Sequence, residues 1–235
     1  MAYRTSGNSN DQLVNNMRGY GLLSNEIAEV FKKVDRRNYV LDERDAYIDA
    51  PQQIKCNATI SAPHMHAEAT MNLLPFLKPG ARVLDVGSGS GYTAAIFYHL
   101  VRSDNPTENG PSGKVVGIDH MPDLVSWSIE NLRKDGLGRA VDKGEIEMVA
   151  GDGRKGWPPA APYDAIHVGA AAPALPEALV DQLKAPGRMF IPIGVGAQKI
   201  YQVDKDEAGN VQTKPLLDVM YVPLTDQEKQ ASRFF

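Results

Sequence analysis

The stretch 83–96 constrains the fold of this chain more than any other segment. It starts with a short apolar run that contains Asp85, passes through three alternating glycines, and opens into an apolar-periodic segment. This order predicts a strand, a tight turn and a helix. Gly87 and Gly89 leave no side chain between the backbone and a ligand, and glycine accepts the backbone angles of a sharp turn. Because the turn leads into a helix N-terminus, the stretch favours a ligand with an anionic group there.

A second acidic strand end lies further along the chain. Segment 113–119 is apolar and ends in Asp119. In nucleotide-binding α/β folds, a carboxylate at the tip of the second strand binds the two hydroxyls of a ribose. Asp119 could instead merely cap a helix that begins near Met121. The glycine turn upstream favours the ribose role.

The rest of the chain predicts a doubly wound α/β fold. Strands are expected at 83–86, 113–119, 146–149, 163–169 and 187–193, with helices at 11–18, 24–34, 63–77, 92–101, 122–134 and 176–183. Strands that alternate with helices indicate a mainly parallel sheet. Segment 35–60 shows no periodicity, and 103–112 is expected to be a surface insertion. A C-terminal antiparallel hairpin is expected from 199–203 and 211–222. One domain over residues 1–235 is the first expectation, and two small domains the second.

Composition excludes several classes of function. A formal charge of −4 argues against a general nucleic-acid partner, which would need a basic face. The chain has no apolar run of the roughly 18 residues that a membrane helix requires, and its first residues lack the apolar core of a signal peptide. Cys56 is the single cysteine, so no internal disulfide is expected. A cytoplasmic monomer fits these observations, and an organelle is also compatible with them.

Neither a metal site nor a covalent nucleophile is expected. His64 and His66 are two residues apart, which suits neither ligands on one helix face nor a zinc knuckle. Ser61 and His64 are separated by a proline, and no G-x-S-x-G elbow surrounds the serine. Ser61 is therefore interpreted as a hydrogen-bond donor.

The glycine spacing separates two kinds of nucleotide-type ligand. The dinucleotide fingerprint is G-x-G-x-x-G, and Tyr92 occupies its third glycine position here. A nicotinamide oxidoreductase is therefore disfavoured. The observed G-x-G-x-G after Asp85 resembles the first motif of S-adenosylmethionine-dependent methyltransferases. In those proteins the turn packs against the amino-acid part of a cofactor that has no phosphate.

Several longer segments resemble the protein-L-isoaspartate (D-aspartate) O-methyltransferase family over nearly the whole chain. They are 49–52, 58–67, 84–91, 117–120, 151–154, 163–173 and 221–230. The runs 59–66 and 163–173 are the most specific. The chain departs from the family in its longer insertion at 103–112 and at Ala231, where the family often has an aromatic residue.

The resemblance implies methyl transfer from S-adenosylmethionine to the free α-carboxylate of L-isoaspartyl and D-aspartyl residues in damaged proteins. The ester then closes to a succinimide, which starts repair, and S-adenosylhomocysteine is the other product. The family's active-site serine falls on Ser61. Its cofactor contacts fall on Ala58, Thr59, Ile60, His66, Ser90, Asp119, His120, Asp152, Gly153, Thr225 and Gln230, and the glycine turn adds Asp85, Gly87 and Gly89. Considered without the resemblance, Asp152 could bond an adenine amino group or be a plain turn residue.

The chemistry agrees with this set of residues. A carboxylate is already ionised at neutral pH, since its pKa is near 4, so its methylation needs placement and exclusion of water rather than a strong base. Ser61 could orient such an acceptor. A small-molecule O-methyltransferase is the main alternative, and a module that binds the cofactor without turnover is another. The small-molecule alternative gives no reason for the run 59–66.

Overall fold

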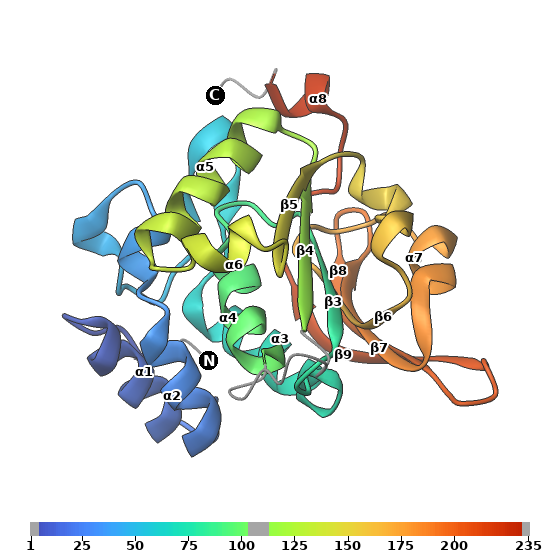
Figure 1. Ribbon diagram of the computed structural model, residues 1–235, viewed down its shortest axis with the longest axis horizontal. Helices are drawn as coiled ribbons and strands as arrows, with labels where there is room; N and C mark the ends of the chain where they lie inside the picture. Colours follow the sequence, from blue (N-terminus) through green and yellow to red (C-terminus); the bar gives the residue numbers. More distant parts are fainter. Residues whose placement is uncertain (1–4, 103–112, 232–235) are drawn as a thin grey trace.

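The computed structural model describes residues 5–102 and 113–231 (Figure 1). The α-helices are α1 (Asn10–Gly19), α2 (Asn25–Lys33), α3 (Pro63–Leu73), α4 (Tyr92–Val101), α5 (Pro122–Lys134), α6 (Gly138–Asp142), α7 (Glu177–Gln182) and α8 (Gln227–Ala231). The strands are β1 (Gln52–Gln53), β2 (Thr59–Ile60), β3 (Arg82–Val86), β4 (Lys114–Asp119), β5 (Ile146–Ala150), β6 (Tyr163–Val168), β7 (Leu183–Ile193), β8 (Gln198–Lys205) and β9 (Val211–Val219). Short 3-10 helices are η1 (Arg36–Tyr39), η2 (Glu43–Asp45), η3 (Lys55–Asn57), η4 (Leu74–Phe76), η5 (Gly153–Lys155) and η6 (Pro158–Ala160). The expected insertion at 103–112 lies outside the described residues.

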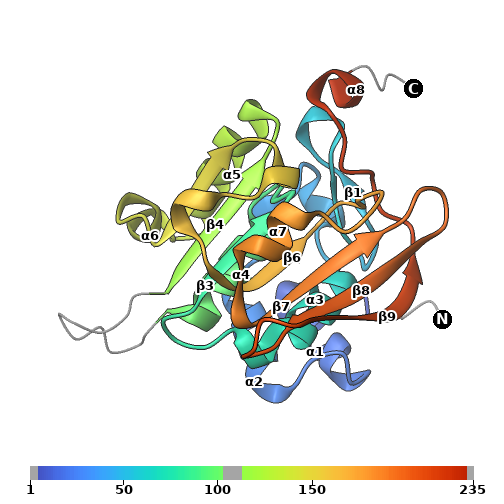
Figure 2. The same ribbon diagram turned by 90° about the vertical axis from the view of Figure 1, so that its right-hand side faces the viewer.

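The main sheet has the strand order β5-β4-β3-β6-β7-β8-β9 (Figure 2). Neighbouring strands from β5 to β7 are parallel, and β8 and β9 extend the sheet as an antiparallel hairpin. The chain winds from β3 towards β5 in one direction and from β6 towards β9 in the other. Ligands of such sheets bind beyond the carboxyl ends of the strands where the direction reverses, which here is between β3 and β6. The doubly wound, mainly parallel sheet predicted from the sequence is confirmed.

Both faces of the parallel strands are buried, which explains their apolar sequences. Helices α3, α4 and α5 contact one face of the sheet, and α7 contacts the other (Figure 1). Successive side chains of β3 alternate between the two layers. Val83 belongs to the core under α4, whereas Leu84 and Val86 belong to the core on the side of α7. Asp85 follows the same alternation and is directed towards the layer of α4, where it is 1% exposed.

The structure departs from the predicted elements at several places, and the helix predicted over 63–77 ends at Leu73 and is followed by η4. Segment 35–60 contains η1, η2, η3 and a short β1–β2 hairpin. Strand β7 begins at Leu183, directly after α7, because it pairs with β6 on both sides of a register shift. Helices α6 and α8 were not expected; each has five residues, too few to show a helical period. Strand β9 ends at Val219 rather than 222. In the described part of the chain, no helix is long and apolar enough to cross a bilayer.

Candidate active site

An outer cavity opens at the carboxyl ends of β3, β4 and β6, where the strand order reverses. It is lined by Asn57, Ala58, Thr59, Gly87, Gly89, Ile118, Asp119, His120, Gly153, Gly169, Ala170, Val222, Pro223, Leu224, Thr225 and Gln230. Nine of these residues were predicted as cofactor contacts. They come from segments that are up to 172 positions apart in the chain, and the topology of the sheet brings them together.

The glycine turn forms the floor of this cavity. Gly87 and Gly89 have φ values of 72° and 53°, which lie in the left-handed region that side chains disfavour. The Gly87 N–H donates to the Ile118 carbonyl at 2.8 Å, so the turn is fastened to the end of β4. The backbone therefore faces the cavity in a fixed position without intervening side chains.

Asp119 lies at the tip of β4 with its carboxylate held by two backbone donors. Its Oδ2 accepts from the Gly89 N–H at 3.2 Å, and its Oδ1 accepts from the Met121 N–H at 3.1 Å. Burial raises the pKa of Asp119, and these two hydrogen bonds act in the opposite direction. A carboxylate has about four acceptor positions, so about two are left for a pair of hydroxyl groups.

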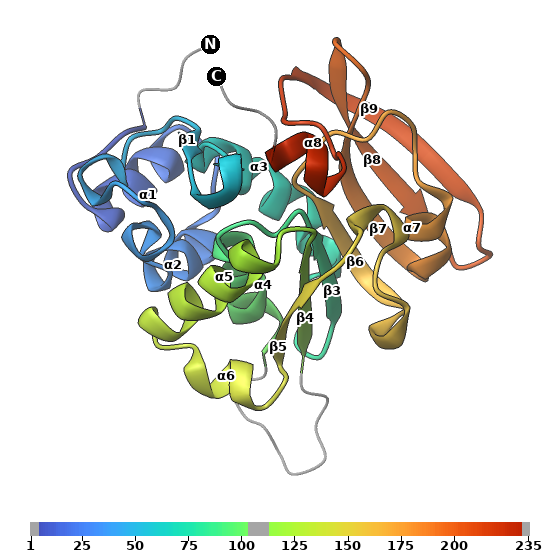
Figure 3. The same ribbon diagram turned by 90° about the horizontal axis from the view of Figure 1, so that it is seen from above.

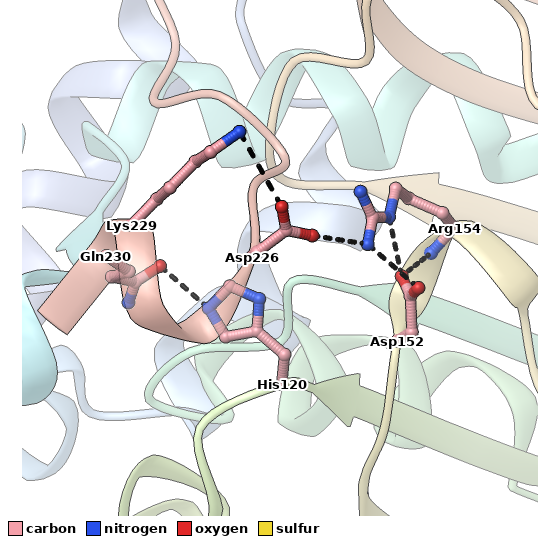
Figure 4. A network of polar contacts seen from close by, with 6 residues as sticks. All are labelled: His120, Asp152, Arg154, Asp226, Lys229 and Gln230. Atoms are coloured by element: carbon pink, nitrogen blue, oxygen red, sulfur yellow. Dashed lines mark hydrogen bonds and ion pairs between the residues drawn. The ribbon is translucent and has the colours of Figure 1, made fainter.

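The C-terminal segment closes the outer cavity through bonds to three separate loops, and Figure 4 shows two of them, at His120 and at Arg154. The Gln230 side chain bonds His120 Nε2 at 2.8 Å and donates to the Cys56 carbonyl at 2.9 Å. Arg154, which follows β5, forms ion pairs with Asp152 at 2.8 Å and with Asp226 at 2.7 Å. Figure 3 shows the resulting position of α8 beside η3.

Arg154→Met tests whether this closure retains the cofactor. We expect the dissociation rate of S-adenosylhomocysteine to rise roughly two- to fivefold, because the lost ion pairs are solvent-exposed and such pairs are individually weak. Stopped-flow displacement measures this rate. Arg133→Met is the matched control, since it removes an exposed Arg133–Asp142 pair on the far end of α5. An unchanged rate in Arg154→Met would mean that the Gln230 contacts alone hold the segment.

An inner cavity continues from the glycine turn towards α3. It is lined by Thr59, Ile60, Ser61, His66, Gly87, Ser88, Gly89, Ser90, Tyr92, Thr93, His167 and Gly169. Three buried polar atoms of its lining have no hydrogen-bond partner in the described ranges 5–102 and 113–231: His66 Nε2, Ser88 Oγ and Tyr92 Oη. His66 Nδ1 is bonded to Thr93 Oγ1 at 3.1 Å, and burial holds the pKa of His66 well below its ordinary value. His66, Ser88 and Tyr92 thus offer the cavity neutral donors and acceptors.

Ser61 lies between β2 and α3, at the junction of the inner cavity and the C-terminal segment. Burial raises the pKa of Tyr221 to about 12, and a hydrogen bond with the Ser61 side chain acts in the opposite direction. Asp49 fastens the start of α3, because its Oδ1 accepts from His64 N at 3.0 Å and contacts His64 Nδ1 at 2.8 Å. The loop that carries Ser61 is therefore fixed at its far end.

Two predicted cofactor residues lie elsewhere than at these two cavities. Asp85 is 1% exposed and pairs with His167 Nδ1 at 2.7 Å below the glycine turn. It therefore supports the turn and a residue of the inner cavity. Asp152 faces a neighbouring surface hollow with Arg154 and Asp226. The other predicted site residues all line the outer or the inner cavity, and a direct cofactor contact by Asp85 or Asp152 stays a prediction.

Sequence reasoning missed several residues that the fold brings to the site. Cys56 and Asn57 both adopt left-handed backbone angles, with φ of 57° and 54°, which is unusual for residues other than glycine. This conformation places Asn57 in the lining of the outer cavity and the Cys56 carbonyl against Gln230. Arg36 is 25 positions before Ser61 and donates to its carbonyl. No local pattern signals either arrangement, because both depend on contacts between distant segments.

The fold and this site define a class I S-adenosylmethionine-dependent methyltransferase. The family model described as protein-L-isoaspartate(D-aspartate) O-methyltransferase (PCMT) matches residues 8–229. The chain belongs to this family, so the family resemblance predicted from the sequence is confirmed.

Two relatives with this name are similar over almost their full length. A protein-L-isoaspartate O-methyltransferase 1 of Arabidopsis thaliana is 46% identical over 227 residues, which are 96% of this chain and 95% of the relative. A protein-L-isoaspartate O-methyltransferase of Caenorhabditis elegans is 44% identical over 236 residues, which are 99% of this chain and 100% of the relative. A Plasmodium falciparum structure of that name, in complex with S-adenosyl-L-homocysteine, is 33% identical with a TM-score of 0.83, and the match covers 93% of this chain and 99% of that one.

Proposed function

We propose that this protein transfers the methyl group of S-adenosylmethionine to the free α-carboxylate of L-isoaspartyl and D-aspartyl residues in damaged proteins and peptides. The methyl ester formed in this way closes to a succinimide, and the reaction thereby starts repair. The observation that carries the proposal is the combination of Ser61, held at the edge of the inner cavity, with a glycine turn and Asp119 around the outer cavity. Membership in the family supports the same activity.

The cavity residues fit the cofactor. Asp119 keeps acceptor positions for the two ribose hydroxyls, and His120 and Gln230 lie beside it. The unpartnered His66 Nε2 and Ser88 Oγ suit the polar amino-acid end of the same molecule. The remaining proposed contacts are Ala58, Thr59, Ile60, Asp85, Gly87, Gly89, Ser90, Asp152, Gly153 and Thr225. When bound, the cofactor supplies an electrophilic methyl group on a positively charged sulfur.

The acceptor side needs little more than placement. The substrate carboxylate is ionised at neutral pH, and Ser61 donates a hydrogen bond that orients one of its oxygens. Gly169 and Ala170 form an outer-cavity wall without large side chains, so an extended peptide backbone can approach closely. The C-terminal segment excludes water from the reacting atoms. In-line placement supplies a large part of the rate enhancement in such a transfer.

The finer properties follow from the same proposal. We infer that residues 1–235 act as a single domain and that the protein is a cytoplasmic monomer, with isoaspartyl-containing proteins and peptides as its partners. Its formal charge of −4 and the described linings of the two cavities, which contain no lysine or arginine, support a role without nucleic acid.

One incubation tests this function against the alternatives. The protein is mixed with methyl-labelled S-adenosylmethionine and a pair of peptides that differ only in carrying an isoaspartyl or an aspartyl residue. We expect label on the isoaspartyl peptide alone, and the label should be lost in mild base because the product is an ester. Tight cofactor binding without label on either peptide would instead favour a binding module. Label on small hydroxyl or carboxyl compounds alone would favour a small-molecule O-methyltransferase.

A further inference from the structure

Arg36 carries a buried positive charge directly behind the Ser61 loop. The residue is 0% exposed and lies in η1, which is anchored through a 2.8 Å hydrogen bond from the Tyr39 hydroxyl to Asp135. Its Nη2 donates to the Ser61 carbonyl at 2.8 Å, and its guanidinium carbon lies 5.3 Å from the centre of the Tyr92 ring. Burial lowers the pKa of Arg36 to about 10, so the side chain is still a cation at neutral pH.

This charge has no carboxylate partner. Within residues 5–102 and 113–231, Arg36 forms no ion pair, and its buried Nε and Nη1 make no hydrogen bond. Asp49 is the acidic group whose charge acts on Arg36, but the oxygens of Asp49 are bonded to His64 and Thr5. A buried cation without a partner is costly. Its position therefore calls for an anion that the folded chain itself does not provide.

The field of Arg36 reaches the inner cavity. Tyr92 and His66 both line that cavity, and their rings are in contact with centres 5.0 Å apart. Burial is the largest cause that lowers the pKa of His66, and the positive charge of Arg36 is the second largest. An anion placed at Ser61 would experience the same field with the opposite, favourable sign, and in the desolvated interior such interactions are stronger than in water.

We propose that Arg36 is a positioning residue that selects an anionic methyl acceptor, because it fixes the Ser61 carbonyl and supplies the positive field that draws a carboxylate to the Ser61 hydroxyl. This inference rests on the proposed function and deepens it. It assigns the preference for a carboxylate over a neutral acceptor to one buried side chain. Arg36 itself touches neither the acceptor nor the cofactor.

The test compares two peptides in the presence of S-adenosylhomocysteine. One carries an isoaspartyl residue, and the other carries the corresponding α-carboxamide, which has the same shape without the charge. For the unmodified protein, we expect the carboxylate peptide to bind at least about tenfold more tightly by calorimetry. In Arg36→Met, which keeps the apolar stem, this ratio is expected to fall close to one. If the role of Arg36 were structural alone, the substitution would weaken the binding of both peptides equally and leave the ratio of their affinities unchanged. That result would overturn the proposal.

Two further variants keep the test decisive. Arg36→Lys retains the positive charge but not the planar guanidinium group. We therefore expect the ratio of the two peptide affinities to be largely kept while kcat falls several-fold. Loss of the ratio in a folded Arg36→Lys protein would also overturn the proposal. Arg188→Met is the matched control, because Arg188 lies over the Phe76 ring and donates to the Asn72 carbonyl far from the site. Its ratio should equal that of the unmodified protein. Failure of the unmodified protein to methylate the isoaspartyl peptide would defeat the proposed function instead.

Discussion

Ser61→Ala is expected to lower kcat about 10²-fold, which is typical when one preorganised hydrogen-bond donor is removed from a reacting oxygen. The reason is geometric. The hydroxyl lies at the inner cavity, on a loop held by Arg36 and Asp49, so its position is fixed before the acceptor binds. Steady-state methylation of the isoaspartyl peptide measures the loss.

The affinity for S-adenosylhomocysteine should change little in the same variant, because the cofactor contacts are made by other groups. Isothermal calorimetry gives this value independently of turnover. Ser126→Ala is a matched control: Ser126 is exposed on α5, and its hydroxyl donates to the Pro122 carbonyl of its own helix. If Ser61→Ala lost cofactor affinity and turnover to the same extent, Ser61 would be a cofactor residue and its proposed role at the acceptor would be wrong.

The sequence was sufficient for the parts of the fold that rest on local patterns. The buried strands from β3 to β7 could be predicted because each is a short apolar run. The turn at Gly87 and Gly89 could be predicted because its glycine spacing is typical of a ligand-binding turn. The order of β8 and β9 could not be predicted, because antiparallel strands can add to a sheet edge in either order with the same alternation. The elements of segment 35–60 could not be predicted, because its short 3-10 helices are stabilised by contacts with distant residues, such as that between Tyr39 and Asp135.

The residues of the site likewise divide into those that the sequence could predict and those that it could not. Asp119 was recognisable because it ends an apolar strand, and the structure places it in the lining of the outer cavity. Asp85 ends a similar run, but its side chain alternates towards α4 and pairs with His167, a contact with a residue 82 positions away. No pattern in the sequence distinguishes Arg36 from the other charged residues of the chain. Only the packing of η1 behind Ser61 shows that it is buried.

Asp119 combines two features that make cofactor binding sensitive to its charge. Its oxygens are already fixed by the Gly89 and Met121 backbone, so the carboxylate pays little further ordering entropy when the ribose binds. Burial raises its pKa above the usual value for aspartate. The ribose hydroxyls donate to the ionised form, and protonation therefore competes with cofactor binding. Affinity should be highest above the raised pKa and should fall as the pH is lowered through it.

Asp119→Ala is accordingly expected to raise the Kd for S-adenosylhomocysteine roughly 10- to 150-fold, which corresponds to the 1.5–3 kcal/mol of hydrogen bonds to a charged group. Calorimetry at neutral pH measures this change. Asp119→Asn is the sharper variant, because it keeps the shape and removes the charge. Its Kd should no longer increase on acidification in the range where the unmodified protein loses affinity. An unchanged Kd in both variants, or an acid loss that persists in Asp119→Asn, would place the ribose elsewhere in the cavity.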